Sequence, residues 1–231
     1  METPEQTLRG VLQTIENAAK LAGRPRAVNL LAVSKTRSAG EVRALAAAGQ
    51  RAFGENYVRE GATKAAELAD LGLQWHLIGH LQSNKCREAA EVFDWVQSLD
   101  RAKLVPALDK ARPAGRPPLN ILVQVNVDGE ASKSGCAPDQ VPALADAVAA
   151  APHLRLRGLM AIPAPHPDPA RRRDAFGRLR ALFVQTAARH PEIDTLSMGM
   201  SEDFELAIAE GATLVRIGTA LFGPRAVAAR D

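Results

Sequence analysis

One lysine directly follows a run of apolar residues. Lys35 comes after Val28-Asn29-Leu30-Leu31-Ala32-Val33-Ser34, which has the composition of a strand buried on both faces of a sheet. Partial removal of an ammonium group from water lowers its pKa, and the neutral amine attacks carbonyl groups to form Schiff bases. A single lysine in this position is more commonly one whose side chain reaches solvent. Schiff-base chemistry at Lys35 is therefore a hypothesis that needs a second observation.

Two later segments combine glycine with hydroxyl side chains. Ser197-Met198-Gly199-Met200-Ser201 stands before the acidic pair Glu202-Asp203 and fits a strand, a turn and the start of a helix. Arg216-Ile217-Gly218-Thr219 fits a second passage from strand to loop. Backbone N–H groups at such turns bind phosphate, and Ser or Thr hydroxyls complete the site. Each segment alone fits ordinary turns and helix caps equally well, but together with Lys35 they favour a binding site.

Other candidate sites have less support. His76 and His80 have the spacing of zinc ligands on a helix, but Trp75–Gly79 fits a strand, where residues four apart lie about 13 Å from each other. We therefore predict no metal site. Gly54-Glu55-Asn56 places a carboxylate and an amide in a turn, which fits either a site or simple turn chemistry. The motifs typical of serine hydrolases, P-loop kinases, zinc proteases and dinucleotide enzymes do not occur in the sequence.

Composition indicates an ordinary globular protein. Of 231 residues, 46% are hydrophobic and 24% are charged, which excludes disordered and fibrous classes. The net charge of +3 comes from basic residues dispersed among acids, and aromatic residues make up 4%. Few side chains can therefore stack on bases, so we predict no nucleic-acid partner and interpret Arg171-Arg172-Arg173 as a solvated helix face.

No segment predicts a membrane span or a secretion signal. The apolar runs are shorter than the roughly 20 residues that a span needs. The start, Met1–Glu5, is acidic and polar, unlike a signal peptide. Cys86 and Cys136 lie far apart and match no metal-ligand spacing, so both are expected to be reduced thiols. We expect a cytoplasmic protein that does not bind membranes.

Short apolar runs alternate with Ala-rich amphipathic segments along the chain. The predicted strands are Val28–Ser34, Arg51–Gly54, Leu73–Gly79, Trp95–Leu99, Leu119–Val127, Leu156–Ile162, Thr195–Gly199 and Leu214–Ile217. The predicted helices are Pro4–Ala22, Ser38–Ala48, Val58–Ala69, Asn84–Ala90, Ala102–Ala111, Pro138–Ala150, Pro169–His190 and Glu202–Glu210. This alternation predicts an α/β fold, and eight units in about 200 residues fit a closed (β/α)8 TIM-like barrel better than a doubly wound sheet. No linker divides the chain, so we predict one domain over residues 1–231, with residues 1–23 forming an extra helix packed on it.

Six ordered motifs resemble those of the pyridoxal phosphate homeostasis proteins. They are Ala32–Thr36, Phe53–Tyr57, Trp75–Lys85, Gly158–Ala161, Leu196–Ser201 and Val215–Gly223. The resemblance runs from Val28 to Arg225, which is nearly the whole chain. It implies the barrel of the alanine racemase N-terminal domain, which is fold type III of the proteins that bind pyridoxal 5'-phosphate (PLP), and it implies PLP as the cofactor.

The resemblance also implies roles for individual residues. Lys35 would bind PLP as a Schiff base, and Arg216 would face the pyridine nitrogen. The phosphate would be surrounded by Ser197, Met198, Ser201, Gly218 and Thr219, and the ring would be lined by Asn56 and Met160. Lys133, in the polar loop Asn126–Gly135, is a candidate for a second, transient amine contact, although an exposed loop lysine is the commoner explanation.

An arginine beside the pyridine nitrogen limits catalysis. The guanidinium cannot give up a proton, so the ring nitrogen stays unprotonated and the ring is a weaker electron sink. Racemases of the related family take a second base from a C-terminal domain, which this chain, ending at Asp231 with Tyr57 as its only tyrosine, is expected to lack. We therefore expect a PLP carrier or buffer that maintains intracellular vitamin B6 homeostasis without strong catalysis. It would be a monomer that transiently contacts PLP-dependent apoenzymes. A PLP-dependent amino-acid racemase and a cofactor-free Schiff-base aldolase remain the alternatives.

Overall fold

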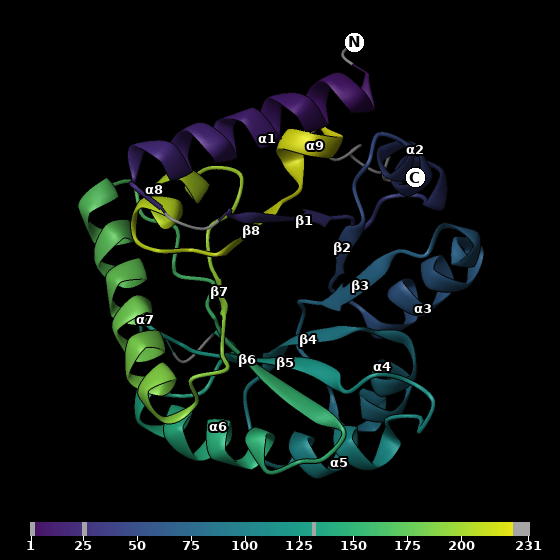
Figure 1. Ribbon diagram of the computed structural model, residues 1–231, viewed down its shortest axis with the longest axis vertical. Coiled ribbons are helices and arrows are strands. Elements are labelled where there is room, and N and C mark those ends of the chain that lie inside the picture. The colour runs from purple at the N-terminus through teal and green to yellow at the C-terminus, as the bar shows by residue number, and fades with distance from the viewer. Residues whose placement is uncertain (1–2, 25–26, 131–132, 224–231) are drawn as a thin grey trace, which may run out of the picture.

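Eight parallel strands close into a barrel in the order β1 to β8. The computed structural model describes residues 3–24, 27–130 and 133–223, so the remaining residues of the predicted 1–231 domain lie outside the described ranges. Figure 1 shows the strands as an inner ring with helices around it. The predicted α/β (β/α)8 barrel is confirmed.

The strands are short and mostly buried. They are β1 (Asn29–Val33), β2 (Ala52–Glu55), β3 (Gln74–Leu77), β4 (Trp95–Leu99), β5 (Leu119–Gln124), β6 (Leu154–Met160), β7 (Thr195–Ser197) and β8 (Leu214–Ile217). The predicted bounds of β4 and β8 are confirmed. β5 ends at Gln124, before the predicted Val127, and beyond it Val125 pairs in parallel with Cys136 in an isolated bridge.

Helices follow the strands around the outside of the barrel. They are α2 (Ala39–Ala47), α3 (Val58–Glu67), α4 (Cys86–Val92), α5 (Leu104–Ala111), α6 (Val141–Ala149), α7 (Pro169–Arg189), α8 (Phe204–Ala209) and α9 (Thr219–Phe222). Short 3-10 helices occupy Ala69–Leu71, Ser83–Lys85 and Pro138–Gln140. The helix α9 was not predicted, because four residues are too few to show a helical period.

An additional helix, α1 (Pro4–Leu21), precedes the barrel and lies against α8 and α9 (Figure 1). The Thr3 side chain accepts a hydrogen bond from the backbone N–H of Gln6, and Pro4 occupies the first helical turn. The helix buries Leu8, Val11, Ile15 and Ala18. Leu12, which the periodicity also placed on this stripe, is 44% exposed because it lies at the edge of the buried face.

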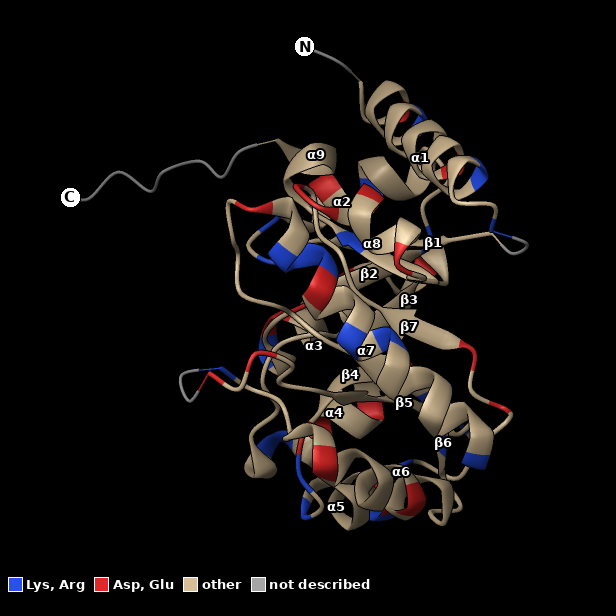
Figure 2. Cartoon of the chain, turned by 90° about the vertical axis from the view of Figure 1, so that its left-hand side faces the viewer, with Lys and Arg blue, Asp and Glu red and all other residues tan. Residues whose placement is uncertain are grey.

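The surface carries both signs of charge. On the face that Figure 2 shows, basic and acidic segments alternate along α7 and the elements beside it. Arg173 forms an ion pair with Glu210, and Arg178 forms ion pairs with Asp128 and Asp174. Among the described residues, no helix is long and apolar enough to cross a membrane.

The lumen of the barrel contains polar side chains. His76, Gln97, Ser197 and Arg216 come from β3, β4, β7 and β8, and each is at most 3% exposed. Barrel lumens of this type are usually filled with branched apolar residues. Buried polar groups must find hydrogen-bond partners, so these four residues need an explanation beyond packing.

Candidate functional site

A cavity of about 920 Å³ lies at the carboxyl ends of the strands. This is the end of a barrel at which loops usually carry binding and catalytic groups. Six of the residues predicted from the sequence line the cavity: Lys35, Asn56, Ser201, Arg216, Gly218 and Thr219. The structure therefore brings together segments from both ends of the chain.

The other three predicted residues lie below the cavity lining. Met160 is fully buried and packs with Trp95 and Leu122. Met198 is fully buried in the main core, and its backbone N–H donates to the carbonyl of Leu214 at 3.2 Å. Ser197 is also fully buried. Their contacts to a cofactor stay predictions.

Lys35 lies in a tight turn after β1. The N–H of Arg37 donates to the carbonyl of Ser34 at 3.0 Å, which closes the turn around Lys35. Thr36 has φ of 63°, a left-handed conformation that β-branched residues rarely adopt. Its N–H donates to Glu60 Oε1 at 2.6 Å. Backbone strain of this kind persists only where the surroundings hold it, and it is common at functional sites.

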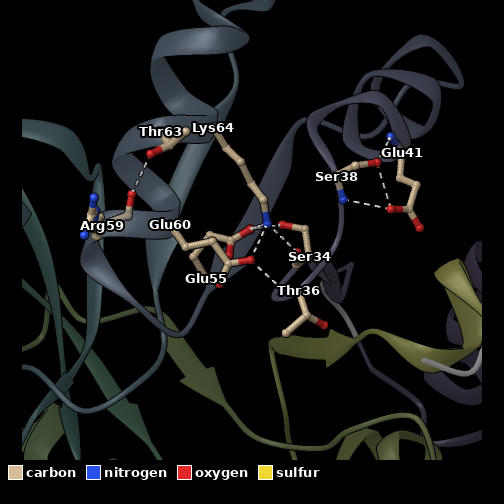
Figure 3. Close-up of polar contacts among 9 residues, drawn as sticks. All are labelled: Ser34, Thr36, Ser38, Glu41, Glu55, Arg59, Glu60, Thr63 and Lys64. Atoms are coloured by element: carbon tan, nitrogen blue, oxygen red, sulfur yellow. Dashed lines mark hydrogen bonds and ion pairs between the residues drawn. The ribbon is translucent and has the colours of Figure 1, made fainter. Parts of the chain in front are cut away.

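A buried group of charges holds this turn from the side of α3. Lys64 Nζ donates to the carbonyl of Ser34 at 2.7 Å and to Oε1 of both Glu55 and Glu60 at 2.8 Å (Figure 3). Ser34 Oγ donates to Glu55 Oε1 at 2.6 Å. Lys64 is 6% exposed and Glu55 is fully buried. We call Ser34, Glu55, Glu60 and Lys64 the Lys64 cluster.

Burial of the Lys64 cluster disfavours the charged form of Glu55 unless hydrogen bonds compensate. Removal from water raises the pKa of Glu55, while hydrogen bonds from Lys64 and Ser34 act in the opposite direction. Glu55 Oε2 is buried and has no hydrogen-bond partner within the described ranges. The carboxylate therefore depends on Lys64 for its charge, and Lys64 links it to the turn that carries Lys35.

Arg216 reaches the cavity from the inside of the barrel. Its Nη1 donates to Ser197 Oγ at 2.7 Å, and its Nη2 donates to the carbonyl of Ala161 at 2.8 Å. Burial lowers the pKa of Arg216 to about 10, and nearby Asp203 opposes that shift. The guanidinium is therefore still a cation at neutral pH, held at two points by residues inside the barrel, and Arg216 is one of the residues that line the cavity.

Further cations line the cavity. Lys133 Nζ and Arg172 Nε are buried, and neither makes a hydrogen bond with any described residue. The prediction of a solvated helix face is therefore wrong for Arg172, whereas Arg171 and Arg173 are exposed. Lys133 Nζ has Glu130 Oε2 as an ionic neighbour at 3.7 Å. Two donors that still lack acceptors, beside the charged Arg216, suit an anionic ligand such as a phosphorylated compound.

The backbone approaches itself closely at two glycines of the cavity lining. A Cβ atom on Gly79 would lie 2.1 Å from the carbonyl oxygen of Asn56, and one on Gly218 would lie 3.2 Å from the carbonyl of Val33. Side chains at these two positions would displace the segments that carry Asn56 and Lys35. The glycines therefore keep the cavity wall in place.

Several residues at this site were not predicted from the sequence. Lys64 was missed, although its place three residues after buried Gly61 and six after buried Val58 puts it on the inner face of α3. His76 was considered only as a metal ligand, and Gln97 was not considered. Each shares its strand with a second polar residue, Gln74 in β3 and Ser98 in β4, so the sequence gives no isolated signal for either.

Comparison with known proteins identifies the family to which the sequence belongs. The sequence profile of the alanine racemase N-terminal domain family matches residues 10–226. A protein of Pseudomonas aeruginosa named pyridoxal phosphate homeostasis protein is 58% identical over 226 residues, which is 97% of each chain. This chain belongs to the pyridoxal phosphate homeostasis protein family. The family member from Escherichia coli K12 is 50% identical and matches 94% of this chain and 95% of its own.

Solved structures extend the comparison. PipY of Synechococcus elongatus, solved with PLP bound, has a TM-score of 0.78 and 40% identity, and the match covers 91% of this chain and all of PipY. Alanine racemase from Corynebacterium glutamicum has a TM-score of 0.65 at 20% identity, and the match covers 63% of that chain. The racemase similarity shows the shared fold alone.

Proposed function

We propose that this member of the family binds PLP reversibly through Lys35 and buffers or delivers it, which maintains vitamin B6 homeostasis without strong catalytic activity. The observation that carries the proposal is the placement of Lys35 in one cavity with Arg216, Ser201 and the Gly218-Thr219 turn. The bound PLP of PipY and the names of the closely similar relatives support it.

The residues of the cavity fit this cofactor. PLP supplies an aldehyde, which a lysine amine binds covalently and reversibly. We assign that amine to Lys35. The buried Lys133 Nζ and Arg172 Nε, which lack hydrogen-bond acceptors among the described residues, support an anionic ligand such as a phosphate.

Each predicted residue keeps a proposed role. We assign Ser201, Gly218 and Thr219 to the phosphate, because all three line the cavity at the ends of β7 and β8. Met198 belongs to the same phosphate prediction, although it is buried behind the lining. The sequence predicts Ser197 there too, but its hydroxyl is bonded inside the barrel to Arg216 and Gln97. We assign Asn56 and Met160 to the ring.

Arg216 is the reason for proposing weak catalysis. Its guanidinium is charged at neutral pH and donates hydrogen bonds only, so it leaves the ring nitrogen of the cofactor unprotonated. An unprotonated ring withdraws electrons less strongly. A racemase function has less support, because the alanine racemases of Corynebacterium glutamicum and E. faecalis are 20% and 19% identical to this chain, whereas relatives at 50% and 58% identity carry the homeostasis name. PLP in PipY also argues against a cofactor-free aldolase.

We further propose that residues 1–231 act as one domain, as a monomer in the cytoplasm, and that PLP passes to apoenzymes through transient contacts. The described residues contain no helix that could span a membrane, which is consistent with this setting. Of the exposed large apolar residues in the described ranges, Ile162 and Met200 line the cavity, and the others are distributed over α1, the start of α3 and α7, which favours a monomer. These others are Leu12, Leu21, Tyr57 and Val184.

The first experiment is an absorption spectrum of the purified protein with added PLP, before and after borohydride, followed by mass mapping of the labelled lysine. We expect a band that borohydride bleaches, with the label on Lys35. Lys35→Ala should remove the label. Lys85→Ala is the control, because Lys85 pairs with Glu88 outside the cavity lining. An unchanged label in Lys35→Ala would overturn the assignment.

A further inference from the structure

A chain of hydrogen bonds runs through the lumen of the barrel, away from the cavity. Arg216 Nη1 donates to Ser197 Oγ at 2.7 Å, and Ser197 Oγ donates to Gln97 Oε1 at 2.7 Å. Gln97 Nε2 lies 2.9 Å from His76 Nδ1, and His76 Nε2 lies 2.9 Å from Gln74 Oε1. The strands β4 and β7 are not neighbours in the closed barrel, so the bond between Gln97 and Ser197 crosses its interior.

The chemistry of the groups sets the direction of this chain. A guanidinium can only donate, so Ser197 accepts from Arg216 and its own hydrogen goes to the Gln97 carbonyl oxygen. The Gln97 amide nitrogen then donates to His76 Nδ1. A neutral imidazole with an accepting Nδ1 carries its hydrogen on Nε2, which donates to Gln74. Every donor therefore points away from the cavity, and each group has the partner it needs.

His76 is held in the form that this direction requires. Burial lowers the pKa of His76 to about 3, with a further contribution from the charge of Arg157, so the ring is neutral at physiological pH. The imidazole stacks on Trp95 with ring centroids 5.1 Å apart and an interplanar angle of 8°. The ring is thus fixed in orientation as well as in charge.

We propose that Ser197, Gln97 and His76 are positioning residues that hold the Arg216 guanidinium in place for the ring nitrogen of the cofactor. Ser197 therefore acts through Arg216 and not on the phosphate. The inference rests on the proposed PLP function. It follows from the burial of Ser197, whose hydroxyl hydrogen is already given to Gln97 and whose oxygen accepts from Arg216.

The chain explains why a flexible side chain stays in one geometry. Hydrogen bonds in a series polarise one another in a medium of low dielectric constant, so the far members strengthen the bond at Arg216. Two of the five guanidinium donors are used by Ser197 and Ala161. The remaining donors belong to a group that also lines the cavity, which leaves that side for a ligand.

The first test needs no cofactor. Nitrogen NMR of the side chain of His76 in the wild-type protein should show a neutral ring with hydrogen on Nε2 and none on Nδ1. A ring with hydrogen on Nδ1, or a charged ring at neutral pH, would overturn the inference and leave the PLP proposal untouched.

The second test separates the ring from the phosphate. Dissociation constants for PLP and for pyridoxal, which lacks the phosphate, are measured for Ser197→Ala and Gln97→Met. We expect each variant to raise the dissociation constants of both ligands by the same factor, roughly tenfold, because each removes a hydrogen bond in the chain that ends at a charged group. The double variant should bind each ligand no more weakly than the weaker-binding single variant, since both substitutions interrupt the same chain of hydrogen bonds.

A matched control comes from the same strand. Ser98 is buried on β4 next to Gln97, and its hydroxyl has no hydrogen-bond partner in the described part of the chain, so Ser98→Ala should leave both affinities unchanged. If Ser197→Ala weakens PLP but not pyridoxal, Ser197 contacts the phosphate and the inference is wrong. If the wild-type protein binds neither ligand, the proposed function itself fails.

Discussion

Replacing Lys64 with methionine should strongly destabilise the protein. Methionine keeps the length and apolar stem of the side chain but removes three hydrogen bonds, to Ser34, Glu55 and Glu60. Glu55 is fully buried, so its carboxylate would lose its cationic partner in a place that water does not reach. The turn that carries Lys35 would lose its anchor at the same time.

The magnitude follows from the burial of the pair. Removing one partner of a buried ion pair typically costs about 3–5 kcal/mol, because the other charge stays uncompensated. For a chain of 231 residues, each kcal/mol shifts the midpoint of thermal unfolding by roughly 2–4 °C, so we expect Lys64→Met to lower Tm by about 6–20 °C.

The stability that Lys64→Met removes should depend on pH in a defined direction. Burial already raises the pKa of Glu55, and loss of Lys64 removes a contribution that lowers it. A carboxyl group whose folded pKa exceeds its unfolded value contributes stability below the unfolded pKa and loses it as pH rises through the folded pKa. The destabilisation by Lys64→Met should therefore be smaller at pH 5 than at pH 8.

Thermal unfolding followed by circular dichroism at both pH values tests this reasoning. Adding Glu55→Gln to Lys64→Met should recover part of the lost stability, because the orphaned charge is gone. Lys85→Met is the matched control: Lys85 is 42% exposed in its pair with Glu88, and its loss should change stability by less than about 1 kcal/mol. A Lys64→Met Tm within 2 °C of the wild type, or an equal loss at both pH values, would refute the argument.

Two further predictions concern the cavity wall and a thiol. Gly79→Ala should weaken PLP binding and lower Tm, because the new methyl group would lie 2.1 Å from the Asn56 carbonyl oxygen. Gly115→Ala, with no atom within 4 Å of the new Cβ, should change neither quantity. Isothermal titration measures the binding, and thermal unfolding measures Tm. Burial raises the pKa of Cys136 to about 12, so its thiol is protonated at neutral pH and iodoacetamide should label it only after unfolding in guanidinium, as mass spectrometry would show. Rapid labelling of Cys136 in the folded protein would contradict the assigned burial.

Some of the positions that line the cavity could be predicted from the sequence because they obey a local rule. Each of these follows an apolar run, and in a barrel of parallel strands all such positions meet at one end. Lys35, Asn56 and the Gly218-Thr219 turn were found in this way, with no knowledge of which residues touch. The bounds of β4 and β8 were predicted for the same reason, since their apolar runs have clear ends. Lys133, in a loop, and Arg172, in α7, also line the cavity and do not follow this rule.

The hydrogen-bonded residues behind the cavity could not be predicted, because each meets its partner only when the barrel closes. Ser197 and Gln97 are separated by 100 positions in the sequence and meet only when β4 and β7 face each other across the lumen. Lys64 is a lysine on an amphipathic helix, and most such lysines reach solvent. Its burial becomes visible only when Glu55 and Ser34 are placed beneath it.

The two polar systems support the site from opposite sides. The Lys64 cluster lies between the strand ends and α3 and holds the turn of Lys35, whereas the chain from Arg216 to Gln74 lies inside the barrel. They share no residue, although Leu31 of β1 pairs in register with Arg216 of β8. Binding groups keep a productive geometry only when the residues behind them are themselves locked by hydrogen bonds and packing. A protein that holds a reactive aldehyde needs the lysine and the ring contact fixed independently, because the covalent bond must form and break while the rest of the cofactor stays in place.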